Sequence, residues 1–365
     1  DLGAPAARGH CLVEVASRVA PLLAVVVLAG AWGRTLNGAV AAVVGLLLVA
    51  AVLAAVHHAE VVAHRVGEPF GSLVLAVAVT VIEVALIVAL MASGGAKAET
   101  LARDTVFSAV MITTAGIVGL SLLSATLRKP IVRFNSEGAG GALATIGALA
   151  VLTLVLPSFT TSSPGPTFTD GQLAFAAVAS ITLYLLFVFV QTVRHRDYFV
   201  APGSDDEDHA APPTNRTAFI SLGMLLVSLV AVVGLAKTLS PTIESAVLSA
   251  GLPLSFVGVI IALVVLLPEG IAAVRAARIG RVQTSLNLAF GSAMASIGLT
   301  IPTIAVAQIW LPTGLQLGLG PVQIVLLALT LFVTALTVVP GRATLQQAGV
   351  HLALFAAFIA VSVAP

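Results

Sequence analysis

Apolar runs of about 20 residues recur along the whole length of this 365-residue chain. A helix of that length crosses a hydrocarbon core of about 30 Å, whereas barrel strands would be about half as long and would alternate in polarity. Charged residues make up only 9% of the chain, far below the share of roughly one quarter found in soluble domains. We therefore expect an all-α membrane protein whose main partner is the lipid bilayer.

Polar or Pro/Gly-rich breaks divide the chain into eleven apolar spans. The predicted spans cover residues 20–33, 36–57, 69–94, 103–126, 139–157, 171–193, 217–237, 253–275, 282–310, 318–339 and 345–364. The first span lacks a small-residue cleavage site, so we expect it to be retained as a helix. Because the number of spans is odd, the two termini should lie on opposite sides of the membrane.

The basic residues are distributed unequally between the two sides that this alternation defines. With a cytoplasmic N-terminus, thirteen of the 17 lie on the inner side: Arg8, Arg18, Arg65, Arg128, Lys129, Arg133, Arg194, Arg196, Arg216, Arg275, Arg278, Arg281 and Arg342. The outer side then holds four: Arg34, Lys97, Arg103 and Lys237. Since cytoplasmic segments are enriched in Lys and Arg, we expect the N-terminus inside and the C-terminus outside.

Net charge and motif content exclude several other classes of protein. A formal net charge of +1 gives no field that would attract nucleic acid, and the single Cys11 cannot form an internal disulfide framework. The sequence contains no HExxH, GxSxG or P-loop motif, so we expect neither an enzyme nor a cofactor. None of the seven histidines is central to a predicted span; His57, His58 and His64 cluster at the cytoplasmic end of the second.

One hydrophilic segment, RHRDYFVAPGSDDEDHAAPPTNR (194–216), separates six spans from five. Its Pro, Gly and acidic residues are typical of a flexible cytoplasmic connection. The acidic run within it, residues 205–208, either collects cations or is simply solvated. We therefore divide the chain into four parts: an N-terminal tail with an extra helix (1–35), a first five-helix repeat (36–193), an acidic linker (194–216) and a second five-helix repeat (217–365).

The two five-helix parts share a weak internal repeat. Residues 73–120 and 259–303 each contain an apolar span with a central glutamate, a short polar turn, and a span rich in small and hydroxyl residues. Within them, DTVFSAVMITTAGI (104–117) aligns with NLAFGSAMASIGLT (287–300). Because five spans per repeat reverse the orientation of the second copy, we expect the inverted-repeat plan of secondary transporters.

Glu83 and Glu269 are the only acidic residues at mid-span, and they occupy corresponding places in the two repeats. A charge at the bilayer centre costs about 2.5–3.5 kcal/mol on insertion scales. Two such glutamates at corresponding positions are therefore improbable by chance. One alternative is a pair of protonated glutamates that are hydrogen-bonded inside the bundle. The functional interpretation is that inverted symmetry brings both carboxylates to one midplane cavity, where they bind a cation or protons.

Several residues near these glutamates could supply oxygen ligands or free a backbone carbonyl: Thr80, Ser292, Ser296, Thr300 and Pro268. The three hydroxyl residues of the second repeat recur every four positions, which places them on one helical face. Proline cannot donate a helical hydrogen bond, so the Val264 carbonyl beside Glu269 is left free. The alternative for the hydroxyls is bonding to their own backbone, or close helix packing.

Asp104 and Asn287 also match between the repeats, but they lie near the ends of their spans. We expect a gating or positioning role for both, with an interfacial cap as the alternative.

Charge balance indicates how a site with two glutamates would work. An empty cavity with both carboxylates ionised is unfavourable in a low dielectric, and either two protons or one divalent cation neutralises it. The site would bind Ca²⁺ from the cytoplasm and return with protons after releasing it outside, which makes the protein an antiporter. The two carboxylates titrate as a coupled pair, so cation binding depends on pH. A channel, by contrast, would conduct without proton counterflow.

The same residues carry a resemblance to a known family. GEPFGSLVLAVAVTVIEVALIVALMASGG (67–95), VRHRDYF (193–199) and LLPEGIAAVRAARIGRVQTSLNLAFGSAMASIGLTIP (266–302) are similar to segments of the bacterial ChaA-type calcium/proton antiporters. These belong to the CAX-like branch of the calcium/cation antiporter superfamily. The resemblance covers nearly the whole chain. It implies one extra helix, two inverted five-helix halves, gating helices that slide across a fixed ion-binding core, and a place in the bacterial cytoplasmic membrane.

The resemblance also implies roles for individual residues. In this superfamily the central glutamate of each repeat binds the cation and carries protons, which assigns that role to Glu83 and Glu269. Hydroxyl residues of the following helix help to bind the cation, and here that pattern falls on Ser292 and Ser296. Cations and protons are thus the expected transported partners.

This sequence departs from the superfamily pattern at several positions. Many relatives have Asn three residues before the glutamate, whereas this chain has Thr80 and Leu266. The first-repeat counterparts of the two serines are Ala109 and Thr113. ChaA-type proteins are also associated with sodium and potassium exchange. The alternative function is therefore a Na⁺(K⁺)/H⁺ antiporter on the same site, in which one sodium balances one carboxylate and the other keeps a proton.

Overall fold

The computed structural model describes residues 4–34, 36–67, 70–92, 99–199, 213–310 and 314–364. Within these ranges the long helices form eleven continuous rods, which confirms the predicted number of spans. The first six rods are α1 (Ala4–Ala31), α2 (Gly38–Val66), α3 (Phe70–Met91), α4 (Leu101–Met111) with η1 (Ile112–Ile117) and α5 (Val118–Thr126), α6 (Ser136–Ala150) with η2 (Val151–Val155) and η3 (Leu156–Ser158), and α7 (Asp170–Phe189) with η4 (Val190–Arg194). The last five are α8 (Asn215–Ser249), α9 (Phe256–Arg278), α10 (Val282–Ala307), α11 (Pro321–Val338) and α12 (Leu345–Val363).

Nine of these rods are long and apolar enough, by length and composition, to cross a membrane. In α1 and α3 the apolar part that the structure describes is shorter, Val15–Ala31 and Val77–Met91. The largest differences from the predicted spans are at α1, which begins at Ala4 instead of residue 20, and at α8, which continues past residue 237 to Ser249 and includes Pro241. Hydropathy locates only the part of a helix that can lie in lipid, whereas the backbone hydrogen bonds of α8 continue into polar sequence.

One compact unit, residues 1–93 and 209–249, contains α1, α2, α3 and α8. Helix α2 packs against the other three, and its buried face is rich in alanine, which allows close approach of helices. Gly234 of α8 makes room for Leu28 of α1, because a Cβ at Gly234 would overlap the Leu28 side chain. His58 of α2 donates from Nε2 to the Ser17 carbonyl oxygen of α1 (3.1 Å).

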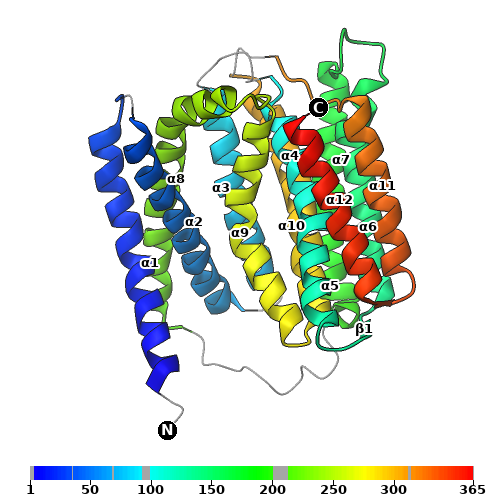
Figure 1. Cartoon of the computed structure of the whole chain (residues 1–365), viewed down its shortest axis with the longest axis horizontal. Coiled ribbons are helices and arrows are strands. Elements are labelled where there is room, and N and C mark those ends of the chain that lie inside the picture. Colours follow the sequence, from blue (N-terminus) through cyan, green and yellow to red (C-terminus); the bar gives the residue numbers. More distant parts are fainter. Residues whose placement is uncertain are drawn as a thin grey trace. The chain divides into compact units, whose positions relative to one another are not determined.

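The second compact unit, residues 94–208 and 250–365, contains the remaining seven rods (Figure 1). The rod made of α4, η1 and α5 is the most buried of the membrane-spanning helices, and α9, α10 and α12 all pack against it. Helix α10 also contacts α6 and α7. These two deeply buried rods, α4–α5 and α10, are the third helices of the two predicted repeats.

The packing inside this second unit is reciprocal between the repeats. Helix α10, the third helix of the second repeat, packs on α7, the fifth helix of the first. In the same way, η1 and α5 of the first repeat pack on α12, the fifth helix of the second. This exchange of partners is what two inverted repeats produce. The compact units cut across the predicted repeat boundaries (36–193 and 217–365), which stay a prediction.

Loops from distant parts of the sequence meet at one end of the second unit. Strand β1 (Val132–Arg133) pairs antiparallel with β2 (Arg342–Ala343), and the Asn135 N–H donates to Gln283 Oε1 (2.7 Å). The turns at Gly280 and Gly341 adopt positive φ angles of 90° and 64°, which glycine tolerates best. Many basic residues belong to this end: Arg128, Lys129, Arg133, Arg194, Arg196, Arg275, Arg278, Arg281 and Arg342.

The segment that leaves the first repeat is held at this same end. Asn287 Nδ2 donates to the Phe199 carbonyl (2.6 Å), and a Cβ at Gly138 would overlap the carbonyl of Tyr198 in η5 (Arg196–Tyr198). A hydrogen bond to Glu137 raises the pKa of the Tyr198 phenol. Residues 200–212 of the predicted linker, including its acidic run, lie outside the described residues.

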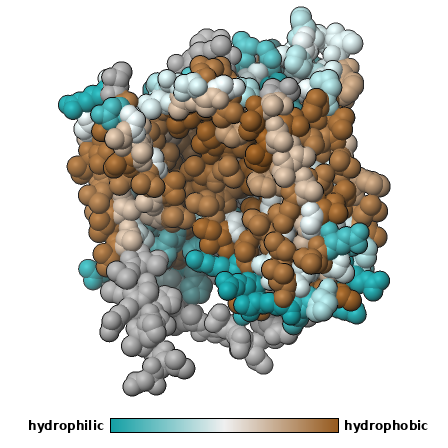
Figure 2. All heavy atoms as spheres, in the orientation of Figure 1, coloured by the Kyte–Doolittle hydropathy of each residue, from teal (hydrophilic) through white to brown (hydrophobic). Residues whose placement is uncertain are grey.

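Surface polarity follows the helices. Apolar side chains cover the middle of the visible face, and hydrophilic ones gather at the ends of the helices (Figure 2). This banding is what a bilayer requires, because only the ends of spanning helices meet water and lipid headgroups.

Candidate cation site

The first mid-span carboxylate lies inside α3 of the first unit. Glu83 is only 3% exposed, and Thr80, one turn earlier on the same helical face, is also 3% exposed. Buried apolar residues flank the glutamate on both sides, including Ile82 and Val84. The structure therefore confirms that this acid is embedded in an apolar helix.

The second mid-span carboxylate lies inside α9 of the second unit. Both carboxylate oxygens of Glu269 are shielded from solvent. Pro268 precedes it without interrupting the helix, so the carbonyl of Val264 loses its usual helical donor, as expected from the sequence. The neighbouring Gly270 brings α9 against η1, since a Cβ at Gly270 would lie 3.4 Å from the Ile117 side chain.

The predicted hydroxyl stripe lies on α10, which packs against α9. Helix α10 is regular from Val282 to Ala307, so Ser292, Ser296 and Thr300 share one face as the four-residue spacing predicts. Ser292 is half-buried, Ser296 is 1% exposed and Thr300 is fully buried. The Thr300 hydroxyl has no hydrogen-bond partner among the described residues, so its oxygen is available to a ligand.

Thr113 lies in a π-helical turn that the sequence did not predict. The turn is η1, and it interrupts the α4–α5 rod. Such turns insert a residue into a helix and are frequent at functional sites. Thr113 is fully buried, and its hydroxyl donates to the carbonyls of Ala109 (2.7 Å) and Val110 (3.0 Å). The hydroxyl hydrogen of Thr113 points at the backbone. The oxygen can therefore still present its lone pairs to a cation.

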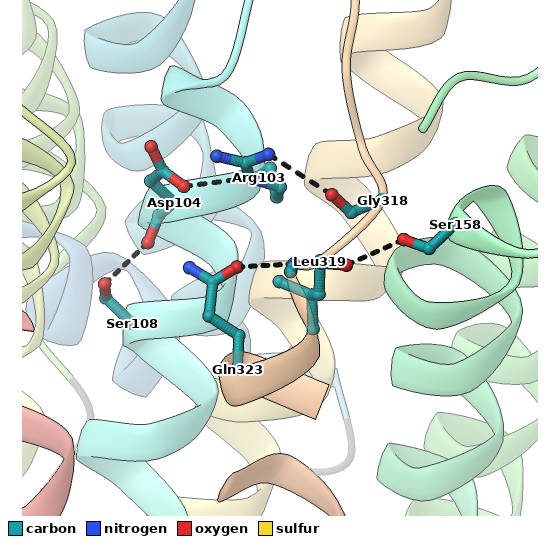
Figure 3. Close-up of polar contacts among 8 residues, drawn as sticks. Arg103, Asp104, Ser108, Ser158, Gly318, Leu319 and Gln323 are labelled. Atoms are coloured by element: carbon teal, nitrogen blue, oxygen red, sulfur yellow. Dashed lines mark hydrogen bonds and ion pairs between the residues drawn. The ribbon is translucent and has the colours of Figure 1, made fainter. Parts of the chain in front are cut away.

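Asp104 lies in the first turn of α4 and is only 4% exposed. Arg103 Nε donates to its Oδ1 (2.9 Å), and Arg103 Nη1 donates to the Gly318 carbonyl (3.2 Å) (Figure 3). Ser108 Oγ donates to the Asp104 carbonyl oxygen (2.5 Å). Asp104 is therefore paired with Arg103, whose guanidinium also links α4 to the segment before α11.

A cavity of about 230 Å³ opens beside Asp104, between α4, α9, α11 and α12. Its wall combines this carboxylate, Ser108 and Gln323 with apolar side chains such as Phe107 and Phe358. Since the Arg103 guanidinium already balances the carboxylate, the cavity offers little net charge to a cation.

Asn287 occupies the opposite end of the second unit, near the start of α10. Its Oδ1 accepts from Gln283 Nε2 (2.9 Å), and its Nδ2 holds the Phe199 carbonyl. Asp104 and Asn287, which align in the sequence, thus both anchor loops. Each lies in the first turns of the third helix of its repeat.

The predicted site residues fall into two groups, one in each compact unit. Glu83 and Thr80 belong to the first unit; Glu269, Pro268, the α10 hydroxyls and Thr113 belong to the second. In the described part of the chain no three His, Cys, Asp or Glu residues gather as a metal cluster. Sequence reasoning missed His351, which is fully buried in α12 although no histidine was expected near the centre of a span.

Comparisons with known proteins show the family and the fold. The chain matches the family model of the sodium/calcium exchanger protein over residues 37–193 and 220–364. It is 49% identical over 323 residues to y4hA of Sinorhizobium fredii, which is named as an ionic transporter, with 87% of each chain covered. It is 36% identical over 351 residues to the sodium-potassium/proton antiporter ChaA of Escherichia coli, with 94% of each chain covered. The crystal structure of the H⁺/Ca²⁺ exchanger CAX has the same fold, with a TM-score of 0.73 at 18% identity over 97% of this chain and 88% of that one.

Proposed function

This chain belongs to the sodium/calcium exchanger protein family and is a cation antiporter, and from this premise we propose that it exports Ca²⁺ from the cytoplasm in exchange for protons. The observation that carries the proposal is the burial of two carboxylates in the middle of apolar helices. Glu83 is 3% exposed, and both oxygens of Glu269 are shielded from solvent. That the two act on one ion is inferred from the inverted-repeat plan of the fold.

The proposed exchange follows from charge balance at the two glutamates. With both ionised and no cation bound, two negative charges would remain in a low-dielectric region, so the empty carrier should resist changing sides. One Ca²⁺ or two protons neutralise the pair, and only the neutralised site can cross between the two access states. Cation and proton transport are thereby coupled in opposite directions.

The remaining ligands in this proposal are oxygens of the neighbouring helices. Hard cations such as Ca²⁺ take six to eight oxygen ligands. The candidates are the hydroxyls of Thr80, Thr113, Ser292, Ser296 and Thr300 and the Val264 carbonyl that Pro268 leaves free. Four of these hydroxyl residues are buried and Ser292 is half-buried, which supports the proposal.

A Na⁺(K⁺)/H⁺ antiporter on the same glutamates is the second candidate. The relative named as a sodium-potassium/proton antiporter, which is 36% identical over 94% of the chain, favours it. In that case one monovalent cation balances one carboxylate, and the other keeps a proton. The number of protons released per cation bound separates the two candidates: two for Ca²⁺ against one for Na⁺.

We also propose that the N-terminus faces the cytoplasm of a bacterial cell and that the C-terminus lies outside. The basic residues that gather at the β1–β2 end of the second unit support this orientation, because cytoplasmic ends are enriched in Lys and Arg.

The test is proton flux in reconstituted vesicles that enclose a pH-sensitive dye. An imposed Ca²⁺ gradient should drive proton movement in the wild type, and Glu83→Gln and Glu269→Gln should each abolish it. Glu244→Gln is the matched control, because it lies in the extended end of α8 and its amide oxygen can still accept from Ser240. Robust exchange in either mid-span variant would refute the two-glutamate site. Flux driven by Na⁺ or K⁺ but not by Ca²⁺ would replace the first candidate with the second.

A further inference from the structure

Helix α12 buries a histidine directly against the π-helical turn η1. His351 is fully buried, its Nδ1 lies 2.9 Å from the Thr114 carbonyl oxygen, and its Nε2 lies 3.1 Å from Thr337 Oγ1. A carbonyl oxygen can only accept, so Nδ1 must carry a hydrogen and donate it to Thr114. The imidazole thus connects three elements: η1, α12 and α11.

The Thr114 carbonyl needs an outside donor because of the π-helical turn. In a regular α-helix the Val118 N–H would donate to this carbonyl. Here the Val118 N–H is directed to the carbonyls of Ala115 and Thr113 instead. A buried carbonyl without its donor is costly, and His351 supplies the missing hydrogen bond.

Two glycines allow α12 to approach closely enough for this contact. A Cβ at Gly119 would lie 3.1 Å from His351 Cβ and 3.0 Å from the Leu352 side chain. A Cβ at Gly116, inside η1, would lie 3.1 Å from the Phe355 ring. Any larger residue at these positions would push α12 away from the turn.

The second ring nitrogen is held by α11. Thr337 Oγ1 lies 3.0 Å from the Val333 carbonyl and 3.1 Å from His351 Nε2. With the hydrogen on Nδ1, a neutral imidazole accepts at Nε2, so the Thr337 hydroxyl can donate to it. This second contact fixes the plane of the ring and aims Nδ1 at η1.

We propose that His351 is a positioning residue for the cation site: it stabilises the π-helical turn and thereby fixes the direction of the Thr113 hydroxyl. Thr113 precedes the Thr114 carbonyl directly and lies inside the same turn. If the turn relaxes to a regular helix, the residues that follow rotate by about 100° about the helix axis relative to those before it. The Thr113 oxygen would then lose its place. This inference rests on the proposed function, because it assumes that Thr113 contributes an oxygen to the cation.

The first arm of the test does not involve transport. Amide hydrogen exchange of peptides covering residues 112–120 should be about tenfold faster in His351→Leu than in the wild type, which corresponds to about 1.4 kcal/mol. His351→Asn should restore the slow rate, since its Nδ2 occupies the place of the ring Nδ1. Peptides from α7 are the control and should not change. Unchanged exchange at 112–120 in His351→Leu would overturn the proposal.

The second arm measures cation-driven proton flux in vesicles. His351→Leu should raise the KM for the cation about fivefold with a maximum rate within about twofold of the wild type, and His351→Asn should recover most of the affinity. A fall in maximum rate with unchanged KM would overturn the positioning role. If His351→Leu does not fold, Gly119→Ala takes its place, because its Cβ displaces His351, and wild-type exchange and KM in that variant would overturn the proposal.

The two arms also separate this inference from the proposed function. If the wild type shows no cation-driven proton flux, the proposed function fails, and the exchange arm still reports whether His351 stabilises η1. If the wild type transports and Glu269→Gln does not, while the His351 variants behave as wild type in both arms, only the positioning role of His351 is refuted.

Discussion

Helices α4 and α9 approach each other closely at Gly258, and replacing this glycine gives a quantitative test of how the two helices pack. A Cβ at this position would lie 2.8 Å from the Asp104 carbonyl carbon and 2.9 Å from the Thr105 nitrogen. Non-bonded carbons pack best at about 3.5–4.0 Å. Both atoms belong to the backbone of a buried helix, so α9 itself must move. We therefore expect Gly258→Ala to destabilise the protein.

The magnitude follows from two opposing effects. Overpacking a well-packed interior costs about 1–3 kcal/mol. Alanine in place of glycine gains about 1 kcal/mol of helix propensity, which masks part of this cost. Gly140→Ala in α6 is the matched control, because nothing lies within 4 Å of its added Cβ. The difference between the two variants cancels the propensity gain, so Gly258→Ala should be less stable than Gly140→Ala by about 1–3 kcal/mol.

The assay is unfolding by SDS titration in mixed micelles, followed by far-UV circular dichroism. Both variants and the wild type are measured at the same lipid-to-detergent ratio, and the free energies of unfolding are compared. A difference below about 0.5 kcal/mol, the scatter expected of surface substitutions, would show that α4 and α9 do not approach closely at Gly258.

Two further predictions concern the cation and the Asp104 end of the second unit. Ser292→Ala should raise the KM for the cation several-fold with little change in maximum rate, because it removes one oxygen ligand but neither charge; an unchanged KM in the vesicle flux assay would exclude Ser292 from the site. Asp104→Asn should destabilise the protein by about 1–3 kcal/mol in SDS titration, because the amide oxygen can still accept from Arg103 but no longer balances the charge of the guanidinium. Replacing both Arg103 and Asp104 by apolar residues should cost less than Asp104→Asn alone, and a larger loss would contradict the ion-pair explanation.

The helices could be predicted from sequence because the signal is local. A run of about 20 apolar residues must form its own backbone hydrogen bonds in lipid, whatever it packs against. For the same reason Glu83 and Glu269 could be located inside helices before any fold was known. The end of α8 was misjudged because a helix that leaves the membrane, as at Lys237 and Glu244, keeps its hydrogen bonds but loses its apolar signal.

The parts of the site that were missed depend on contacts between distant segments. The turn η1 exists where the Thr114 carbonyl finds a donor in His351, 237 residues along the chain, and no local pattern announces that pairing. His351 itself lies in an ordinary apolar helix, and nothing in its sequence surroundings indicates that its ring contacts η1. In the segment TTAGIVG (113–119), only the small residues Gly116 and Gly119 indicate that another helix packs closely here.

Because of the π-helical turn, residues that align between the two repeats do not all occupy equivalent positions in the structure. The alignment pairs Thr113 with Ser296 and Ile117 with Thr300. Both helices are regular before Ile112, but η1 adds a residue to its turn whereas α10 stays regular through Thr300. Ile117 packs against Gly270 and brings no oxygen. At the three aligned positions the first repeat therefore offers one hydroxyl, that of Thr113, whereas α10 offers those of Ser292, Ser296 and Thr300.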